Sequence, residues 1–374
     1  MRKMLFLLLL VCLIKVLNAQ DFAVYTSIDR MAFNIPDSMT NSTGDIARYV
    51  KSHFSGDRTK VRSVYVWVTA NIRYDKDSAN VINTGINPEA KITYALRRRK
   101  GVCENFAAIF NDISIKAGLT SFVVNGYTKQ SGTIDKTAHS WCAVFIDTTW
   151  YLCDPTWDNG SGMNSKYFLV QPAEFIESHM PFDPLWQLLN YTVSHQQFYS
   201  GNIYKNKDAP YFNFSDSVTA YLRMDTLHQL QSTELRIQKQ GIYNSRIKDN
   251  YNYVKMLIEI INQGKDVGLY NSSVSDVKYA ATVLNNFIEY RNKRFTPEKT
   301  DAELAALLKG VDDKLNSSLK KLDVVDKSQA SFTLGTESLR TQLNILLGKI
   351  KEQEDFLNQY LHANKSDRKS LFVK

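Results

Sequence analysis

The order of apolar and polar positions along the chain indicates two regions of different structure. From about residue 21 to about residue 200, stretches with helical spacing alternate with stretches that have the apolar pattern of strands. From about residue 215 onward, every stretch has helical spacing. All five tryptophans lie in the first region. We therefore expect a mixed domain of helices and strands, followed by an all-helical domain.

Two helices of the first region are indicated by apolar residues spaced three and four positions apart. One helix carries Val61, Val64, Tyr65, Val68 and Ile72 on a single face, and the other carries Phe106, Ile109, Phe110, Ile113 and Ala117. Gly118 supplies a stop signal for the second helix. Cys103 lies three residues before Phe106, so it falls in the first turn of that helix, on the buried side. We expect Glu104 and Asn105 to cap the helix rather than to line a cleft.

Strand-like stretches follow, namely SFVVNGYT, HSWCAVFID and TTWYLCDPTW. The last two predict a hairpin that turns near residues 147–149. A symmetric two-residue turn and its simple alternatives all place His139 and Asp154 on one face, because the faces of each strand alternate. The same registers place Cys142 and Cys153 on the opposite face. The two cysteines could be bridged if they lie directly opposite each other, and are otherwise separate buried thiols.

Heptad-like spacing of apolar residues indicates a helical bundle in the second region. The residues with this spacing are Ile247, Tyr251, Val254, Ile258 and Ile261; Leu304, Leu308, Val311, Leu315, Leu319 and Leu322; and Leu339, Leu343, Leu346, Ile350 and Leu357. Helix breakers at residues 264–271, at Pro297 and at residues 328–335 are expected to separate the helices. The pattern predicts an antiparallel bundle of roughly four or five helices that serves packing or partner binding.

The first residues of the chain have the composition of a secretory signal peptide. A basic start precedes an apolar stretch from Leu5 to Leu17, and the small residue Ala19 follows. We expect cleavage after Ala19, which makes residues 1–19 the signal peptide. A membrane helix is the alternative, but the apolar run is short and Lys15 interrupts it. We therefore expect a secreted, periplasmic or cell-surface protein with no membrane span after cleavage.

Charge and cysteine content exclude several classes of function. The formal net charge of +8 falls to +5 once Arg2, Lys3 and Lys15 are removed, and the densest basic run, residues 97–100, contains no aromatic residue. This pattern does not indicate nucleic-acid binding. Without Cys12, three cysteines remain, and the chain has neither a CxxC pair nor a close cluster of histidines and cysteines. We expect no metal, no cofactor and no disulfide framework.

Three residues have the types and positions needed for thiol catalysis. A cysteine attacks as the thiolate, which the positive end of a helix favours, so Cys103 is well placed. His139 opens a strand, and Asp154 ends the next one on the same face. Cys142 and Cys153 point away from His139. The sequence therefore predicts Cys103 as nucleophile, His139 as general base and then acid, and Asp154 as the carboxylate that orients the imidazole.

The motifs around these residues resemble those of the transglutaminase-like superfamily, especially its bacterial secreted and kyphoscoliosis-peptidase-like branch. The matching segments are WVTANIRYD, GVCENFAAIFNDISIKAGLTSFVVNGY and HSWCAVFIDTTWYLCDPTW, within about residues 60–170. The resemblance implies an α+β, papain-like fold, in which a helix carrying the cysteine packs on an antiparallel sheet carrying the histidine and the aspartate. It assigns the same three roles to Cys103, His139 and Asp154.

Together these observations predict a transglutaminase-like domain at residues 20–205 and a helical bundle domain at residues 215–374. The expected function is that of an exported cysteine peptidase or amidase acting on a peptide or protein; transfer of a glutamine acyl group to an amine is the other chemical outcome. The alternative is a catalytically silent module that binds a peptide or a partner protein, with the bundle as its interaction domain. Trp141 and Trp157 flank the motifs and are either substrate-binding walls or core residues.

Overall fold

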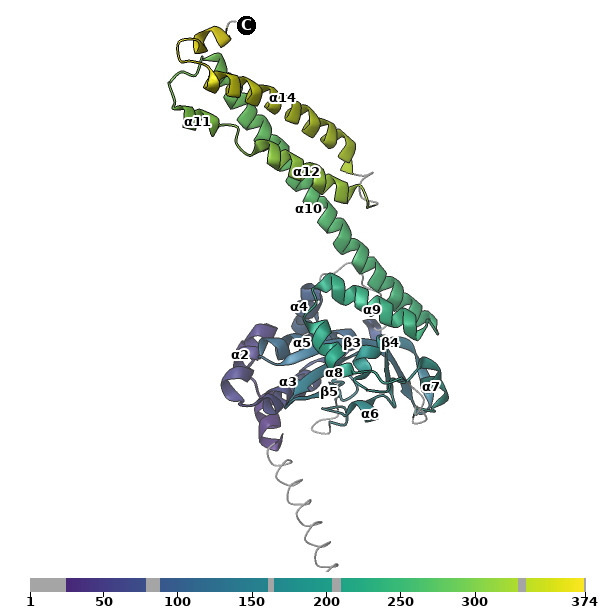
Figure 1. Ribbon diagram of the computed structural model, residues 1–374. Coiled ribbons are helices and arrows are strands. Elements are labelled where there is room, and N and C mark those ends of the chain that lie inside the picture. The colour runs from purple at the N-terminus through teal and green to yellow at the C-terminus, as the bar shows by residue number, and fades with distance from the viewer. Residues whose placement is uncertain (1–24, 79–87, 161–164, 204–209, 329–333, 373–374) are drawn as a thin grey trace, which may run out of the picture. The chain divides into compact units, whose positions relative to one another are not determined.

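The computed structural model describes residues 25–78, 88–160, 165–203, 210–328 and 334–372 (Figure 1). The expected signal peptide, with its cleavage position at Ala19, lies outside the described residues. The chain forms two compact units, Met1–Lys255 and Met256–Lys374. The first unit combines helices with a sheet, and the second is helical.

An antiparallel sheet of four strands organises the first unit, in the order β5-β4-β3-β6. The strands are β3 (Thr120–Gln130), β4 (Thr133–Ile146), β5 (Thr149–Cys153) and β6 (His179–Pro181). A two-residue turn joins β4 to β5, and Asp147 and Thr148 both have positive φ, as the twist of a hairpin requires. Cys142 lies directly opposite Cys153 in this hairpin. The predicted division of its residues between two faces is therefore confirmed.

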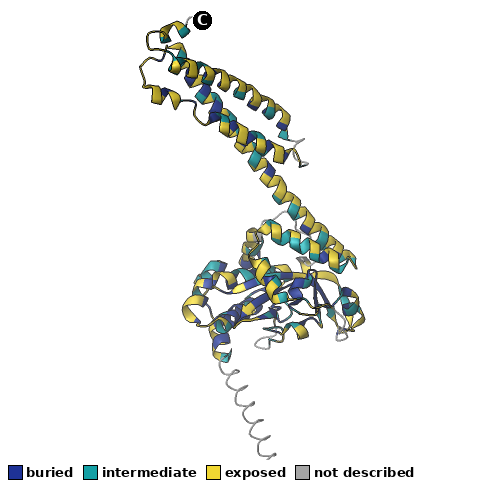
Figure 2. Ribbon diagram, viewed as in Figure 1, coloured by how far each residue is buried: buried dark blue, intermediate teal, exposed yellow. Residues whose placement is uncertain are grey.

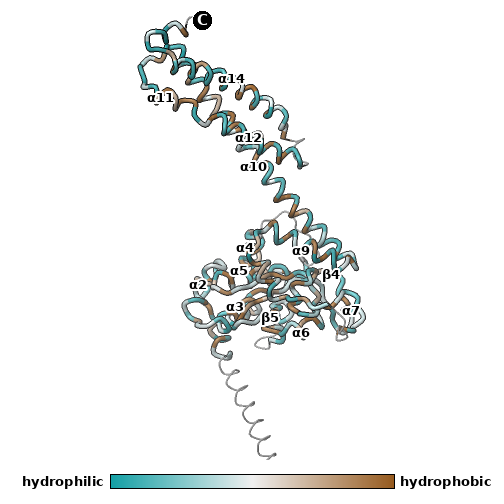
Figure 3. Tube along the Cα trace, in the orientation of Figure 1, coloured by the Kyte–Doolittle hydropathy of each residue, from teal (hydrophilic) through white to brown (hydrophobic). Residues whose placement is uncertain are grey.

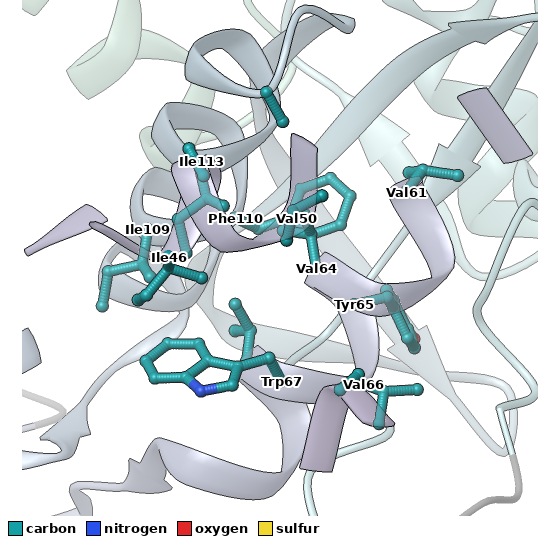
Figure 4. Close-up of a cluster of buried hydrophobic side chains, with 14 of the residues drawn as sticks. Ile46, Val50, Val61, Val64, Tyr65, Val66, Trp67, Ile109, Phe110 and Ile113 are labelled. Carbon is teal, nitrogen blue, oxygen red and sulfur yellow. The ribbon is translucent and has the colours of Figure 1, made fainter. Parts of the chain in front are cut away.

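Helices cover one face of the sheet and enclose the larger of its two hydrophobic cores. These are α2 (Thr43–His53), α3 (Asp57–Asn71) and α5 (Cys103–Lys116), and α4 (Pro88–Arg98) lies between α3 and α5 in the chain. Their apolar faces pack together and against the sheet residues Cys142, Val144 and Ile146. Figure 4 shows Ile46 of α2, Tyr65 and Trp67 of α3, and Phe110 of α5 meeting in this core. The spacing of apolar residues correctly predicted the buried faces of α3 and α5.

The other face of the sheet packs against short elements that follow β5 in the chain. Trp141 and Ala143 of β4 contact a second core that includes Phe175 of α6 (Pro172–Phe175) and Val218 of α8 (Phe214–Leu222). This unit also contains α7 (His195–Ser200) and α9 (Thr226–Gln240). Burial is concentrated in the sheet and in the inner faces of the helices (Figure 2).

Helices α8 and α9 belong to the first unit rather than to the bundle that we expected to begin at residue 215. Val218 of α8 is buried in the core of the sheet. Arg236 of α9 donates two hydrogen bonds of 2.7 Å to the carboxylate of Asp183. Helical spacing identifies an amphipathic helix but does not show which core its apolar face will join, and this is why the sequence placed the boundary too early.

The second unit contains most of α10 (Ser245–Asn292) together with α11 (Asp301–Ala305), α12 (Val311–Val325) and α14 (Thr336–His362). Its core consists of residues with heptad spacing and their neighbours. Polar and apolar residues alternate along the helices (Figure 3). The expected break at residues 264–271 is wrong, because α10 continues through Gly264 and Gly268. An internal glycine costs a helix only about 1 kcal/mol, which packing on both sides can offset. None of the helices in the described part of the chain is long and apolar enough to cross a membrane.

We predict that Gly126→Ala will destabilise the first unit. An added Cβ at Gly126 would lie 2.2 Å from the carbonyl oxygen of Met180 and 2.4 Å from the ring of Trp141. Relieving this overlap must displace β6 or Trp141, at a cost of about 1–3 kcal/mol or more. Urea unfolding followed by tryptophan fluorescence measures the effect, since all five tryptophans lie in the first unit.

The matched control is Gly264→Ala in α10, where an added Cβ would meet no atom within 4 Å. This change should leave the fluorescence transition where it is and raise the stability of the helical unit, seen by far-ultraviolet circular dichroism, by up to about 1 kcal/mol. An equal response of the fluorescence transition to both substitutions would contradict the packing argument.

Candidate active site

Cys103 is the first residue of α5, as the sequence predicted. The helix begins there because Asn105 turns back, so that its side-chain oxygen accepts a hydrogen bond of 3.0 Å from the backbone N–H of Val102. Gly101 leaves room for this cap, since a Cβ there would lie 2.6 Å from the Cβ of Asn105. Glu104 instead forms an ion pair of 3.1 Å with Lys91. The Cys103 thiol is partly exposed and lies at the positive end of the helix.

His139 and Asp154 form a buried pair on the sheet. Nε2 of His139 lies 2.7 Å from Oδ2 of Asp154. The other carboxylate oxygen, Oδ1, accepts hydrogen bonds from the backbone N–H groups of Thr156 and Trp157, at 2.8 and 3.2 Å. The turn after β5 thus holds Asp154 through its own backbone, and the carboxylate is fully buried. Because Nε2 of His139 faces Asp154, its Nδ1 is the nitrogen that remains for Cys103.

Opposite charges set the protonation of this pair. Burial lowers the pKa of His139, but the Asp154 carboxylate, and then hydrogen bonding to Cys103, outweigh it and raise the pKa to about 10. Burial raises the pKa of Asp154, but His139 and then His179 outweigh it and hold that pKa far below its usual value. At neutral pH the pair is therefore an imidazolium and a carboxylate.

A second histidine, His179 of β6, binds the same carboxylate oxygen. Its Nε2 lies 3.1 Å from Oδ2 of Asp154, and its Nδ1 lies 2.8 Å from the Ser178 hydroxyl. Burial lowers the pKa of His179 to about 4, so this ring is neutral at neutral pH. No pattern in the sequence predicted a role for His179. The signal that could have found it is a single histidine directly before a short apolar stretch, residues 180–182.

Trp141 and Trp157 surround the two histidines and differ in exposure. Trp141 is fully buried in the core behind the sheet, with its ring centroid 5.2 Å from that of His179. Trp157 is partly exposed, with its ring centroid 4.3 Å from that of His179 and 5.9 Å from that of His139. Trp141 therefore acts as a core residue, whereas Trp157 keeps a surface that a substrate could touch.

Cys142 and Cys153 face the helical core and are both free thiols. The thiol of Cys142 donates a hydrogen bond of 3.3 Å to the carbonyl oxygen of Ala107. The sulfur of Cys153 accepts a hydrogen bond of 3.3 Å from the backbone N–H of Leu169. Burial raises the pKa of both thiols, that of Cys153 to about 12. Neither is suited to act as a nucleophile.

The side chains of His139, Asp154 and His179 are also the one group in the described part of the chain that could hold a metal ion. Their approach is explained without an ion, because the separations of 2.7 and 3.1 Å between ring nitrogens and carboxylate oxygen are those of hydrogen bonds. A zinc ion would have to bind each donor atom at about 2.0–2.2 Å, in place of both hydrogen bonds.

One cavity lies away from these residues. It has a volume of about 680 Å³ and is lined by Phe145, Trp150, Phe214 and Leu222, among others, near the turn between β4 and β5. His139 lies six residues before Phe145 on β4, a separation of about 20 Å along the strand. This cavity is therefore not the place where a substrate would meet Cys103.

A helix that begins with a cysteine, packed on an antiparallel sheet that carries a buried histidine–aspartate pair, defines the papain-like, transglutaminase-like class of fold. Residues 44–155 match the family model of the transglutaminase-like superfamily, which is the class that the fold of this unit indicates.

Similar proteins include the kyphoscoliosis peptidases of Homo sapiens and Mus musculus. The human protein is 33% identical over 172 residues, which are 40% of this chain and 25% of the relative. The mouse protein is 28% identical over 208 residues, which are 50% of this chain and 30% of the relative. Hillarin of Drosophila melanogaster is 24% identical over 214 residues, which are 47% of this chain and 25% of the relative. The match thus spans less than a third of the length of each of these relatives.

We predict that the histidine–aspartate pair makes the first unit lose stability at alkaline pH. The pKa of His139 is raised from its ordinary value of 6.5, which the unfolded chain retains, to about 10 in the folded protein. Between these values the folded state holds more protons than the unfolded state, so the free energy of unfolding falls as pH rises. Urea unfolding followed by tryptophan fluorescence at pH 6.5, 8 and 9.5 measures this fall.

The control for this experiment is His139→Gln, which removes the titrating ring. The substitution should lower stability at pH 6.5 and flatten the fall between pH 6.5 and 9.5. A slope that is unchanged in the variant would show that other groups cause the alkaline loss.

Proposed function

We propose that the protein is an exported thiol enzyme that opens amide bonds through Cys103, His139 and Asp154, acting as a cysteine peptidase or amidase. The observation that carries the proposal is the hydrogen bond of 2.7 Å between Nε2 of His139 and Oδ2 of Asp154. It keeps His139 protonated and leaves Nδ1 for the partly exposed thiol at the start of α5.

In the first half of the reaction, the Cys103 thiolate attacks the carbonyl carbon of the substrate amide. The negative charge passes to the carbonyl oxygen, and the backbone N–H of Cys103 at the helix start is the donor best placed to stabilise it. The C–N bond then breaks, and the imidazolium of His139 gives its Nδ1 proton to the leaving amine. The products of this half are an acyl-enzyme and a neutral His139.

In the second half, the neutral ring of His139 takes a proton from water, which attacks the thioester. The C–S bond breaks, the acid is released, and the thiolate–imidazolium pair returns. A second amine in place of water would give acyl transfer instead of hydrolysis. The likeness to proteins named kyphoscoliosis peptidases favours a peptide or protein substrate and hydrolysis.

Export and partner binding complete the proposal. The basic start and the apolar stretch from Leu5 to Leu17 support cleavage after Ala19 and a location outside the cytoplasm. The helical unit, with its own hydrophobic core, is a suitable site for a partner protein.

We predict that Cys103 reacts with iodoacetamide at pH 6 much faster than a free thiol of a small reference compound. The reason is the position of the thiol, which lies at the positive end of α5 and next to His139. His139→Gln should slow labelling by about 100-fold, while Cys103→Ser should abolish it. Mass spectrometry of tryptic peptides locates the label, and the buried thiols of Cys142 and Cys153 serve as internal controls that stay unlabelled in the folded protein.

Hydrolysis and transfer are separated by incubating the protein with casein and a biotinylated primary amine. Release of soluble peptides indicates hydrolysis, and biotin on the casein indicates acyl transfer; Cys103→Ser should lose either. If Cys103 labels no faster than the reference thiol and His139→Gln has no effect, the interpretation as an enzyme fails. A catalytically silent module that binds a peptide or a partner would then be the better description.

A further inference from the structure

We propose that His179 is a positioning residue for the reaction, because its Nε2–H holds the Asp154 carboxylate in the orientation that His139 requires. This inference rests on the proposed function, since it adds a residue to the same site. Nε2 of His179 and Nε2 of His139 approach the same oxygen of Asp154, at 3.1 and 2.7 Å.

The carboxylate of Asp154 is held from two sides. The backbone N–H groups of Thr156 and Trp157 hold Oδ1, and the two histidine rings hold Oδ2. Both backbone donors belong to the turn that follows Asp154 itself, so they fix one oxygen relative to the local chain. The other two donors come from different strands, His139 from β4 and His179 from β6. Without His179, the reacting histidine would be the one remaining donor to Oδ2.

The tautomer of His179 follows from its second contact. Ser178 lies 2.8 Å from Nδ1, and its hydroxyl can donate a hydrogen bond to that nitrogen. The proton of the neutral ring is then on Nε2, which is the form that donates to Asp154. Burial, which lowers the pKa of His179 to about 4, keeps the ring in this neutral form. The negative charge of Asp154 is therefore balanced by His139 alone.

Packing holds the ring of His179 in place. It stacks on Phe175, with a distance of 4.0 Å between ring centroids, and lies against Trp157 and Trp141. Its backbone pairs with Thr128 of β3. A ring fixed on this many sides has little freedom to turn, so its N–H can define the direction of the carboxylate.

The test compares His179→Phe with His179→Gln. Phenylalanine keeps a ring that can stack on Phe175 but has no N–H, whereas the glutamine amide can restore a donor to Asp154. NMR titration of the protein, labelled with ¹³C in its histidines, gives the pKa of His139, and iodoacetamide gives the reaction rate of Cys103. We expect His179→Phe to lower the pKa of His139 and to slow labelling about 10- to 100-fold, and His179→Gln to recover most of both.

The control for lost packing is Leu185→Ala, which opens a cavity in the same core without removing a donor. It should lower stability by about 2–5 kcal/mol while leaving the pKa of His139 unchanged. The inference is overturned if His179→Phe changes stability alone, or if the pKa of His139 rises, which would mean that His179 only weakens the charge of Asp154.

A measurement on the unaltered protein covers the case in which His179→Phe does not fold. The ¹⁵N spectrum should show His179 protonated at Nε2 and unprotonated at Nδ1 at pH 7, and the opposite tautomer would overturn the inference. Failure of the proposed function is distinguishable. If Cys103 is unreactive in the unaltered protein, the proposed enzyme activity is refuted. The NMR response of His139 to His179→Phe still reports whether His179 positions Asp154.

Discussion

The charge of Asp154 is the constraint on which the rest of the site depends. A carboxylate that is fully buried costs several kcal/mol unless donors replace the lost water. This protein supplies four donors from three places: the turn that follows β5, the strand β4 and the strand β6. The hydroxyl of Tyr65 on α3 adds a hydrogen bond of 2.9 Å to the backbone carbonyl of Asp154. The sheet, the turn and a helix of the main core therefore meet at a single residue.

The hairpin of β4 and β5 determines which side chains can reach that carboxylate. With Cys142 opposite Cys153, the hairpin sends both thiols into the helical core and sends His139 and Trp141 to the other face. A shift of one residue in this register would bury the histidine among aliphatic side chains and point a cysteine at Asp154. The positive φ angles in the tight turn that follows β4 help to exclude such a shift.

Local patterns in the sequence predicted the features that depend on local geometry. The start of α5 at Cys103 and the shared face of His139 and Asp154 follow from helical spacing and strand alternation, and the structure has both. The role of His179 depends on β6 pairing with β3, about 50 residues apart in the chain. No periodic pattern reports such a pairing, because β6 is only three residues long. The placement of α8 and α9 was missed for a related reason, because the apolar pattern of a helix does not show which other element the helix packs against.

Two histidines on one carboxylate raise a problem of charge that their surroundings resolve. If both rings were protonated, one buried positive charge would have no partner, and the energy of that charge would be high. Burial lowers the pKa of both rings. For His139, the interactions with Asp154 and Cys103 outweigh burial and raise the pKa to about 10. For His179, burial outweighs the interaction with Asp154, the charge of His139 adds to it, and the pKa falls to about 4. One ring carries the charge beside the thiol, and the other donates a hydrogen bond without competing for that charge.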